Sequence, residues 1–208
     1  MLKIIGGNAK GRRIGLKKSF SKKDACPLRP TSAKVRKAIF DIIQDRICNA
    51  SFLDLYAGSG AVGIEALSRG SSRVVFVDAS PLRGRAIKEM LQDIGFGDRA
   101  QVFRGSAKSF IEKLSNMEEK YFDIIFADPP YGSQELDEII PLLDKKDIIS
   151  DNGILIVEHS SKRPAMPAMI GNLRLLKQYK YGDTKLSLYM KSGSVGSDKK
   201  YNKNGAVL

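Results

Sequence analysis

Runs of apolar residues alternate with helical patterns from residue 52 onward, and this alternation constrains the fold more than any other feature of the chain. The expected strands lie at about 52–56, 73–78, 100–104, 122–127 and 153–158. The expected helices lie at about 60–69, 81–95, 106–117 and 134–143. This pattern predicts an α/β, doubly wound, mostly parallel sheet. The segments 173–181 and 184–190 have no helix between them and are expected to form an antiparallel hairpin.

The first 30 residues are organised differently from the α/β segment. Residues 2–5 and 12–16 are expected to form two strands around a glycine-rich turn, which gives an N-terminal β-hairpin extension. A helix is expected to begin soon afterwards, with Thr31 or Ser32 as its N-cap. The sequence thus predicts three parts: a basic hairpin and arm at 1–30, an α/β domain at 31–190 and a disordered tail at 191–208.

The positive charge of the chain is concentrated near its N-terminus. The net charge is +12, and residues 1–40 alone contain twelve Lys or Arg and one acid, Asp24. Residues 41–190 are nearly balanced in charge. A cluster of this kind is typical of a surface that binds a phosphate-rich partner, the alternative being a solvated surface that keeps the chain soluble. We favour nucleic acid because the charge is so unevenly distributed.

The segment 122–131 joins a buried strand to a rigid corner. Pro129 and Pro130 have fixed φ angles and no backbone donors, so the strand ends at Asp128. Ligands of open α/β sheets bind at this end of the strands. The Asp128 carboxylate and the Pro129 carbonyl can accept the two N–H bonds of an amine on a planar base, and Tyr131 can stack on that base. The alternative is a turn in which Asp128 only caps a helix.

A glycine-rich turn follows the first strand of the α/β segment. Gly58 and Gly60 let the backbone approach a ligand closely, and Gly63 lets the next helix pack on the sheet. Asp78 ends the second strand, where an acid accepts bonds from ribose hydroxyls, the alternative being a helix cap. Asp54 precedes the glycines and would oppose a pyrophosphate. It suits a ligand with an ammonium group, such as S-adenosylmethionine, whose sulfonium makes its methyl group electrophilic.

These elements, in this order, resemble those of a class I S-adenosylmethionine-dependent amino-methyltransferase. More narrowly, residues 2–190 resemble the RsmD family, which methylates N2 of a guanine in the 16S ribosomal RNA of the small subunit. The resemblance rests on Ile4-Ile5-Gly6-Gly7 with Gly11-Arg12-Arg13, on Leu28-Arg29-Pro30-Thr31 with Val35-Arg36, on the run from Asp54 to Gly70, on the Pro-Pro corner and on Tyr181-Gly182-Asp183-Thr184. It implies a seven-stranded class I methyltransferase sheet at 31–190, S-adenosylmethionine as cofactor, and 16S ribosomal RNA or the small ribosomal subunit as partner.

The resemblance also implies roles for individual residues. The catalytic residues are expected to be Asp128, Pro129, Pro130 and Tyr131. The cofactor is expected to contact Asp54, Tyr56, Ala57, Gly58, Ser59, Gly60, Asp78, Ala79, Ser106 and Ala107. The RNA is expected to contact Arg12, Arg13, Lys17, Lys18, Lys22, Lys23 and Arg29 in the N-terminal extension. Two positions depart from the usual family pattern, since Asp78 stands in place of Glu and Ser106 in place of an Asp near the adenine.

The composition disfavours several other kinds of protein. No apolar run approaches the ~18 residues of a membrane span, and the N-terminus lacks the apolar region of a signal peptide. Cys26 and Cys48 make no disulfide or metal-binding pattern, and the single histidine, His159, is expected to be a polar residue at a strand end. We therefore expect a cytoplasmic monomer without a metal.

Four other functions share part of this pattern. The Pro-Pro corner also serves DNA adenine N6 methylation and, with Asn in place of Asp, glutamine methylation in proteins. A nicotinamide-dependent dehydrogenase would use the glycine turn alone, and a non-catalytic ribosome-assembly factor would use the basic arm alone. The RsmD-like N-terminus disfavours DNA, and the basic arm disfavours a protein substrate. The Pro-Pro corner disfavours a dehydrogenase, and the complete cofactor motif disfavours a binding factor.

Overall fold

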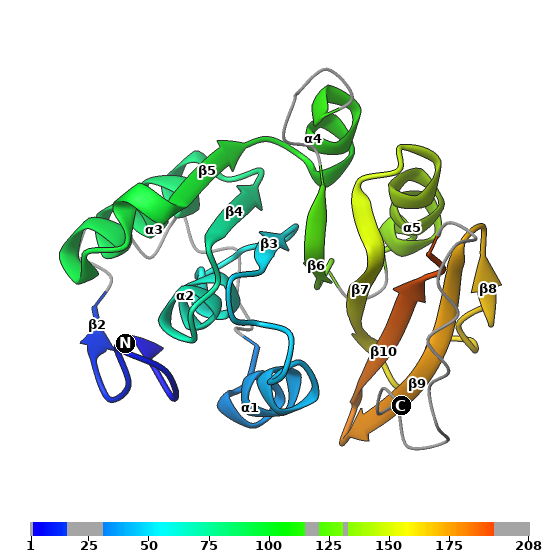
Figure 1. The fold of residues 1–208 in the computed structure, drawn as a ribbon, viewed down its shortest axis with the longest axis horizontal. Coiled ribbons are helices and arrows are strands. Elements are labelled where there is room, and N and C mark those ends of the chain that lie inside the picture. The colour runs from blue at the N-terminus through cyan, green and yellow to red at the C-terminus, as the bar shows by residue number, and fades with distance from the viewer. Residues whose placement is uncertain (1, 16–30, 115–120, 131–132, 194–208) are drawn as a thin grey trace.

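The computed structural model describes residues 2–15, 31–114, 121–130 and 133–193, and its main feature is a single large sheet (Figure 1). Its strands are β3 (Ser51–Asp54), β4 (Arg73–Asp78), β5 (Ala100–Arg104), β6 (Phe122–Ala127), β7 (Ile149–Ser160), β8 (Met169–Ile170), β9 (Leu173–Tyr181) and β10 (Thr184–Lys191). They lie in the order β5-β4-β3-β6-β7-β10-β9-β8. The pairs from β5 to β7 are parallel, and the pairs from β7 to β8 are antiparallel. The expected mostly parallel, doubly wound sheet is confirmed.

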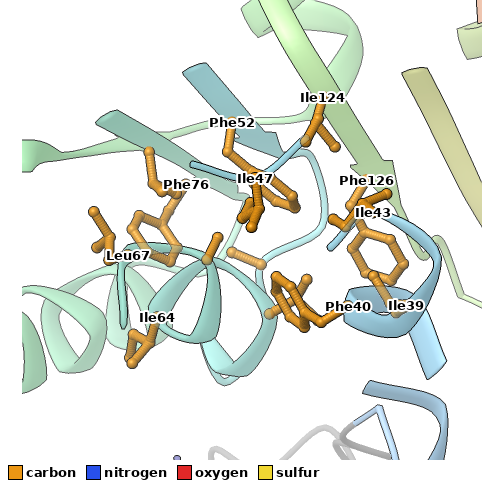
Figure 2. Packing of buried hydrophobic residues seen from close by; sticks show 14 of the residues in the cluster. Ile39, Phe40, Ile43, Ile47, Phe52, Ile64, Leu67, Phe76, Ile124 and Phe126 are labelled. Carbon is orange, nitrogen blue, oxygen red and sulfur yellow. The ribbon is translucent and has the colours of Figure 1, made fainter. Parts of the chain in front are cut away.

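Five α-helices cover the two faces of the sheet in the described part of the chain, and a short 3₁₀ helix, η1 (Gly97–Arg99), precedes β5. The α-helices are α1 (Ala33–Ile42), α2 (Ala61–Ser68), α3 (Pro81–Ile94), α4 (Ala107–Leu114) and α5 (Glu135–Lys145). Alternate strand residues point to opposite faces. Phe52, Phe76 and Phe126 therefore pack with α1, α2 and α3, and Figure 2 shows them beside residues of α1 and α2. Leu53 and Ile125 pack with α4 and α5 on the other face.

The ends of the helices follow from local sequence. At the start of α1, the Ser32 side chain accepts a hydrogen bond from the Val35 amide at 3.2 Å, so Ser32 is the cap and Thr31 is not. Helix α3 starts with Ser80 as cap and a proline in its first turn. It ends at Gly95, whose φ of +76° is readily adopted only by glycine.

The N-terminal hairpin is docked on α2. Its strands β1 (Leu2–Lys3) and β2 (Arg13–Ile14) are short and antiparallel. The amide of Ile5 donates to the Glu65 carboxylate at 2.9 Å, and the amide of Ala9 donates to the Ser68 hydroxyl at 3.0 Å. That hydroxyl in turn donates to the Gly6 carbonyl at 2.6 Å. The described part of the extension is therefore fixed to the α/β sheet by hydrogen bonds along α2.

A buried group of charges ties the same hairpin to α1. Arg36 donates to the Lys3 carbonyl at 2.7 Å and lies 3.8 Å from Glu65. The second oxygen of Glu65 accepts from Arg69 at 2.9 Å. Arg36 and Glu65 are 4% and 1% exposed, so this ion pair is shielded from water. This group of charges therefore links the hairpin to both α1 and α2.

Two features of the sheet differ from the sequence-based expectation. Strand β7 begins at Ile149, several residues before 153, because Ile149 pairs with Phe122 ahead of a register shift. The two-residue strand β8 adds an eighth strand at the edge beside β9, where seven were expected. The predicted arm beyond residue 15 and the tail from 194 lie outside the described residues. Within the described part, no helix is long and apolar enough to cross a membrane.

Candidate active site

Three acidic residues lie at one edge of the sheet, at the carboxyl ends of adjacent strands. Strand β3 lies between β4 and β6, and Asp54 is in register with Phe76 on one side and with Phe126 on the other. Asp78 and Asp128 each follow these partners by two residues. The topology therefore brings the Asp54 motif, the Asp78 position and the Pro-Pro corner to the same edge, as the sequence predicted for a ligand site.

The turn between β3 and α2 is built by glycines with positive φ. Gly58 and Gly60 have φ of +54° and +73°, a conformation that side-chain-bearing residues rarely adopt. Gly63 lies against the ring of Phe76, and a Cβ atom at this position would be 2.2 Å from a ring carbon. The helix consequently packs directly on β4, and its N-terminus starts at the edge that carries the acids.

Asp54 is buried and only partly hydrogen-bonded. One carboxylate oxygen, Oδ2, accepts from the Gly63 amide at 3.0 Å. The other, Oδ1, is buried without a hydrogen-bond partner among the described residues. Burial raises the pKa of Asp54 to about 7, and the negative charges of Asp128 and Asp78 add to this effect. A cationic group bound beside Asp54 would stabilise its ionised form, so this oxygen fits a ligand with an ammonium group.

The Asp78 carboxylate ties the glycine turn to the start of α3. It accepts from the amide of Gly58 at 2.9 Å, from the amide of Ser80 at 2.7 Å and from the Arg83 guanidinium at 2.8 Å. A carboxylate has about four acceptor positions, so roughly one remains for a ligand hydroxyl. Asp78 therefore holds the glycine turn in place while it keeps capacity for a ribose.

The Pro-Pro corner follows β6 directly. Asp128 is half-buried, Pro129 is buried and Pro130 is exposed. The Thr31 hydroxyl lies 3.5 Å from Asp128 Oδ2 and donates to it. Thr31 precedes α1 and lies 97 residues before Asp128 in the sequence, so its position beside a helix start indicated a cap and not this contact. Tyr131, the expected stacking residue, lies outside the described residues.

The remaining predicted cofactor residues surround the same edge. Ala57 is buried and Ser59 half-buried in the glycine turn, and Ala79 is exposed just after Asp78. Burial raises the pKa of the Tyr56 hydroxyl, and the nearby Glu135 carboxylate raises it further. Ser106 accepts from the Ser109 amide at 3.1 Å, so its side chain caps the start of α4, where Ala107 is buried. The adenine contact expected at Ser106 stays a prediction.

The predicted RNA-binding residues fall into two groups. Arg12 is exposed, but its guanidinium donates to the carbonyls of Ile94 and Asp93 at 3.1 and 3.2 Å. It thereby anchors the hairpin to the C-terminal end of α3, a role that the charge pattern does not reveal. Arg13 is exposed on β2. The other predicted contacts, Lys17, Lys18, Lys22, Lys23 and Arg29, lie outside the described residues.

The fold and this site together define a class of protein. A mostly parallel sheet that continues into an antiparallel hairpin, with a glycine turn, two acids and an Asp-Pro-Pro corner at one edge, is the architecture of a class I methyltransferase that uses S-adenosylmethionine. Among the described residues, no three His, Cys, Asp or Glu side chains gather in a group that could hold a metal ion.

Comparison with known proteins identifies the family. The family described as "Conserved hypothetical protein 95" matches residues 2–190, and the chain belongs to it. "Putative rRNA methyltransferase YlbH" of Bacillus subtilis is 33% identical, covering 92% of this chain and 100% of the relative. "Ribosomal RNA small subunit methyltransferase D" of Escherichia coli is 29% identical, covering 95% and 93%. The resemblance to the RsmD family drawn from the motifs is therefore confirmed.

Solved structures agree with this assignment. The structure titled "Putative methyltransferase yhhF from Escherichia coli" superposes with a TM-score of 0.77 and is 29% identical, covering 93% of this chain and 99% of that one. A more distant RNA methyltransferase from Salinibacter ruber, solved with S-adenosyl-L-homocysteine, has a TM-score of 0.60 at 12% identity, with coverage of 81% and 97%. The distant likeness shows that the fold is shared.

Proposed function

We propose that the protein transfers a methyl group from S-adenosylmethionine to the exocyclic N2 amine of a guanine in 16S ribosomal RNA, within an assembled or assembling small subunit. The observation that carries this proposal is the Asp128–Pro129 corner beside Asp54 and Asp78 at one sheet edge. The ribosomal RNA substrate is supported by relatives whose names describe ribosomal RNA methyltransferases.

Two acidic residues of the site would bind different groups of the cofactor. Asp54 would face the ammonium of the cofactor, and Asp78 would accept a ribose hydroxyl. Bound S-adenosylmethionine supplies an electrophilic methyl group, which passes to the amine while S-adenosylhomocysteine is left and the amine loses a proton. The chain itself provides orientation, and fixed orientation is worth several orders of magnitude in rate.

The corner suits an amine because of its acceptors. The nitrogen lone pair of guanine N2 is delocalised into the ring, so the amine must be held to react. The Asp128 carboxylate and the Pro129 carbonyl would each accept one N–H bond, which fixes the amine and favours a pyramidal nitrogen with a less delocalised lone pair. Tyr131 would stack on the base, and stacking of this kind contributes ~1–3 kcal/mol. The guanine must leave its helix or come from a loop to reach the corner.

Replacing Asp128 tests this assignment. Asp128→Ala should abolish methyl transfer to small ribosomal subunits and leave the dissociation constant of S-adenosylmethionine within about twofold of the wild type. Calorimetry gives the second quantity, and tritium incorporation gives the first. Asp123→Ala is the matched control, because this exposed aspartate lies at the opposite end of the same strand and should leave transfer intact. Retained transfer in Asp128→Ala would contradict the proposed role.

A further inference from the structure

The N-terminal end of α1 reaches the catalytic corner from outside the methyltransferase motifs. Its cap is Ser32, whose hydroxyl is occupied by the Val35 amide. The neighbouring Thr31 hydroxyl is not needed as the cap and instead donates to Asp128 Oδ2 at 3.5 Å. This contact joins two residues that are far apart in sequence, and nothing in the local helix geometry requires it.

We propose that Thr31 is a positioning residue that orients the Asp128 carboxylate for the reaction. This inference rests on the proposed function, since it assigns Asp128 the role of holding the amine. A carboxylate at a strand end is free to rotate about its side-chain bonds unless a neighbour holds it. The Thr31 donor on Oδ2 restricts this rotation and helps to keep the carboxylate directed at the amine.

Thr31 is itself held by a rigid support. Ile39 and Phe40 of α1, with Ile43 at its C-cap, pack in one buried cluster with Phe126 of β6, the strand that directly precedes Asp128 (Figure 2). This packing fixes the helix that follows Thr31 and the strand that precedes Asp128 relative to each other. A loosely attached residue could not orient a carboxylate, whereas one anchored by a packed core can.

The same helix connects the contact to the RNA-binding extension. One turn beyond its cap, buried Arg36 donates to the Lys3 carbonyl of the hairpin at 2.7 Å and pairs with Glu65. Glu65 also holds the Ile5 amide of the hairpin. The position of α1, and with it Thr31, is therefore set partly by hairpin docking. The extension then helps to shape the catalytic corner as well as to bind RNA.

Two substitutions at Thr31 separate a positioning role from a purely structural one. Thr31→Val keeps the shape of the side chain but removes the donor, and we expect kcat for methyl transfer to small ribosomal subunits to fall ~10-fold. The KM and the calorimetric dissociation constant for S-adenosylmethionine should stay within about twofold of the wild type. Thr31→Ser restores the hydroxyl and should recover kcat to within about threefold of the wild type.

Ser32→Ala is the matched control, because it weakens the start of the same helix and leaves the Thr31 hydroxyl in place. It should lower the melting temperature and change kcat by less than about twofold at 25 °C. Equal kcat in Thr31→Val and wild type would overturn the inference, as would a large loss of cofactor affinity or a failure of Thr31→Ser to rescue. A wild-type enzyme that transfers no methyl group would overturn the proposed function itself.

Discussion

The buried carboxylate of Glu65 offers a quantitative test of how the hairpin is held. Glu65 is 1% exposed and accepts from the Ile5 amide and from Arg69, with Arg36 at 3.8 Å. Glu65→Ala removes all three contacts. Arg36 would then be left as a buried cation, and burial already lowers the pKa of this guanidinium.

The size of the effect follows from the geometry. Breaking a buried ion pair by removing one partner destabilises a protein by about 3–5 kcal/mol. Arg36→Met should have a smaller effect, about 1–2 kcal/mol, because Glu65 keeps Arg69 as a second cationic partner. The exposed Lys37–Asp41 pair on the same helix provides the control, and Asp41→Ala should change stability by less than about 0.5 kcal/mol.

Urea unfolding and hydrogen exchange measure this series. With a slope of about 2 kcal/mol per M, Glu65→Ala should lower the unfolding midpoint by about 2 M, Arg36→Met by less than 1 M and Asp41→Ala hardly at all. Exchange of the Ile5 amide, whose acceptor is Glu65, should accelerate in Glu65→Ala only. Equal midpoints for Glu65→Ala and Asp41→Ala, with the Ile5 amide still protected, would refute the reasoning.

Three further predictions concern strain and protonation. Gly7→Ala should lower the melting temperature by several degrees more than Gly11→Ala. Both glycines have positive φ, so both substitutions strain the backbone. Only at Gly7 does the new Cβ also clash, because it would lie 1.8 Å from the Ser68 carbonyl oxygen, whereas a Cβ at Gly11 would contact nothing within 4 Å. Burial lowers the pKa of the His159 imidazole in the folded protein. The melting temperature should therefore be constant above pH ~6.5, the pKa of an unfolded-state histidine, and should fall as the pH drops below it. His159→Gln should remove this contribution to the pH dependence of the melting temperature. Because the pKa of Asp54 is raised to about 7, its ionised form increases as the pH rises. The affinity for S-adenosylmethionine should therefore increase about tenfold from pH 6 to pH 8, and an equal pH dependence in Asp54→Asn would contradict this.

The parts of the site that depend on strand ends could be predicted from the sequence. Asp54, Asp78 and Asp128 each follow an apolar run, and parallel strands place their carboxyl ends together. The alternation of strands and helices, with Gly95 as a helix end, is likewise a local signal. These features depend on residues that are neighbours in the chain, so periodicity and turn chemistry are sufficient to find them.

The contacts between distant segments could not be predicted in this way. Arg12 and Arg36 belong to the basic cluster, yet one caps the carbonyls at the end of α3 and the other is buried against Glu65. Net charge does not distinguish an arginine that anchors a hairpin from one that contacts phosphate. The Thr31–Asp128 contact could not be predicted either, because it depends on how α1 packs beside β6.

The identity of the methylated nucleoside tests the central claim most directly. Wild-type protein and tritiated S-adenosylmethionine would be incubated with unmodified small ribosomal subunits, naked 16S ribosomal RNA and duplex DNA, and the labelled nucleosides would be separated by chromatography. We expect N2-methylguanosine from the subunits, with less or none from naked RNA and none from DNA. Label in N6-methyladenine, or no transfer to any of the three substrates, would contradict it.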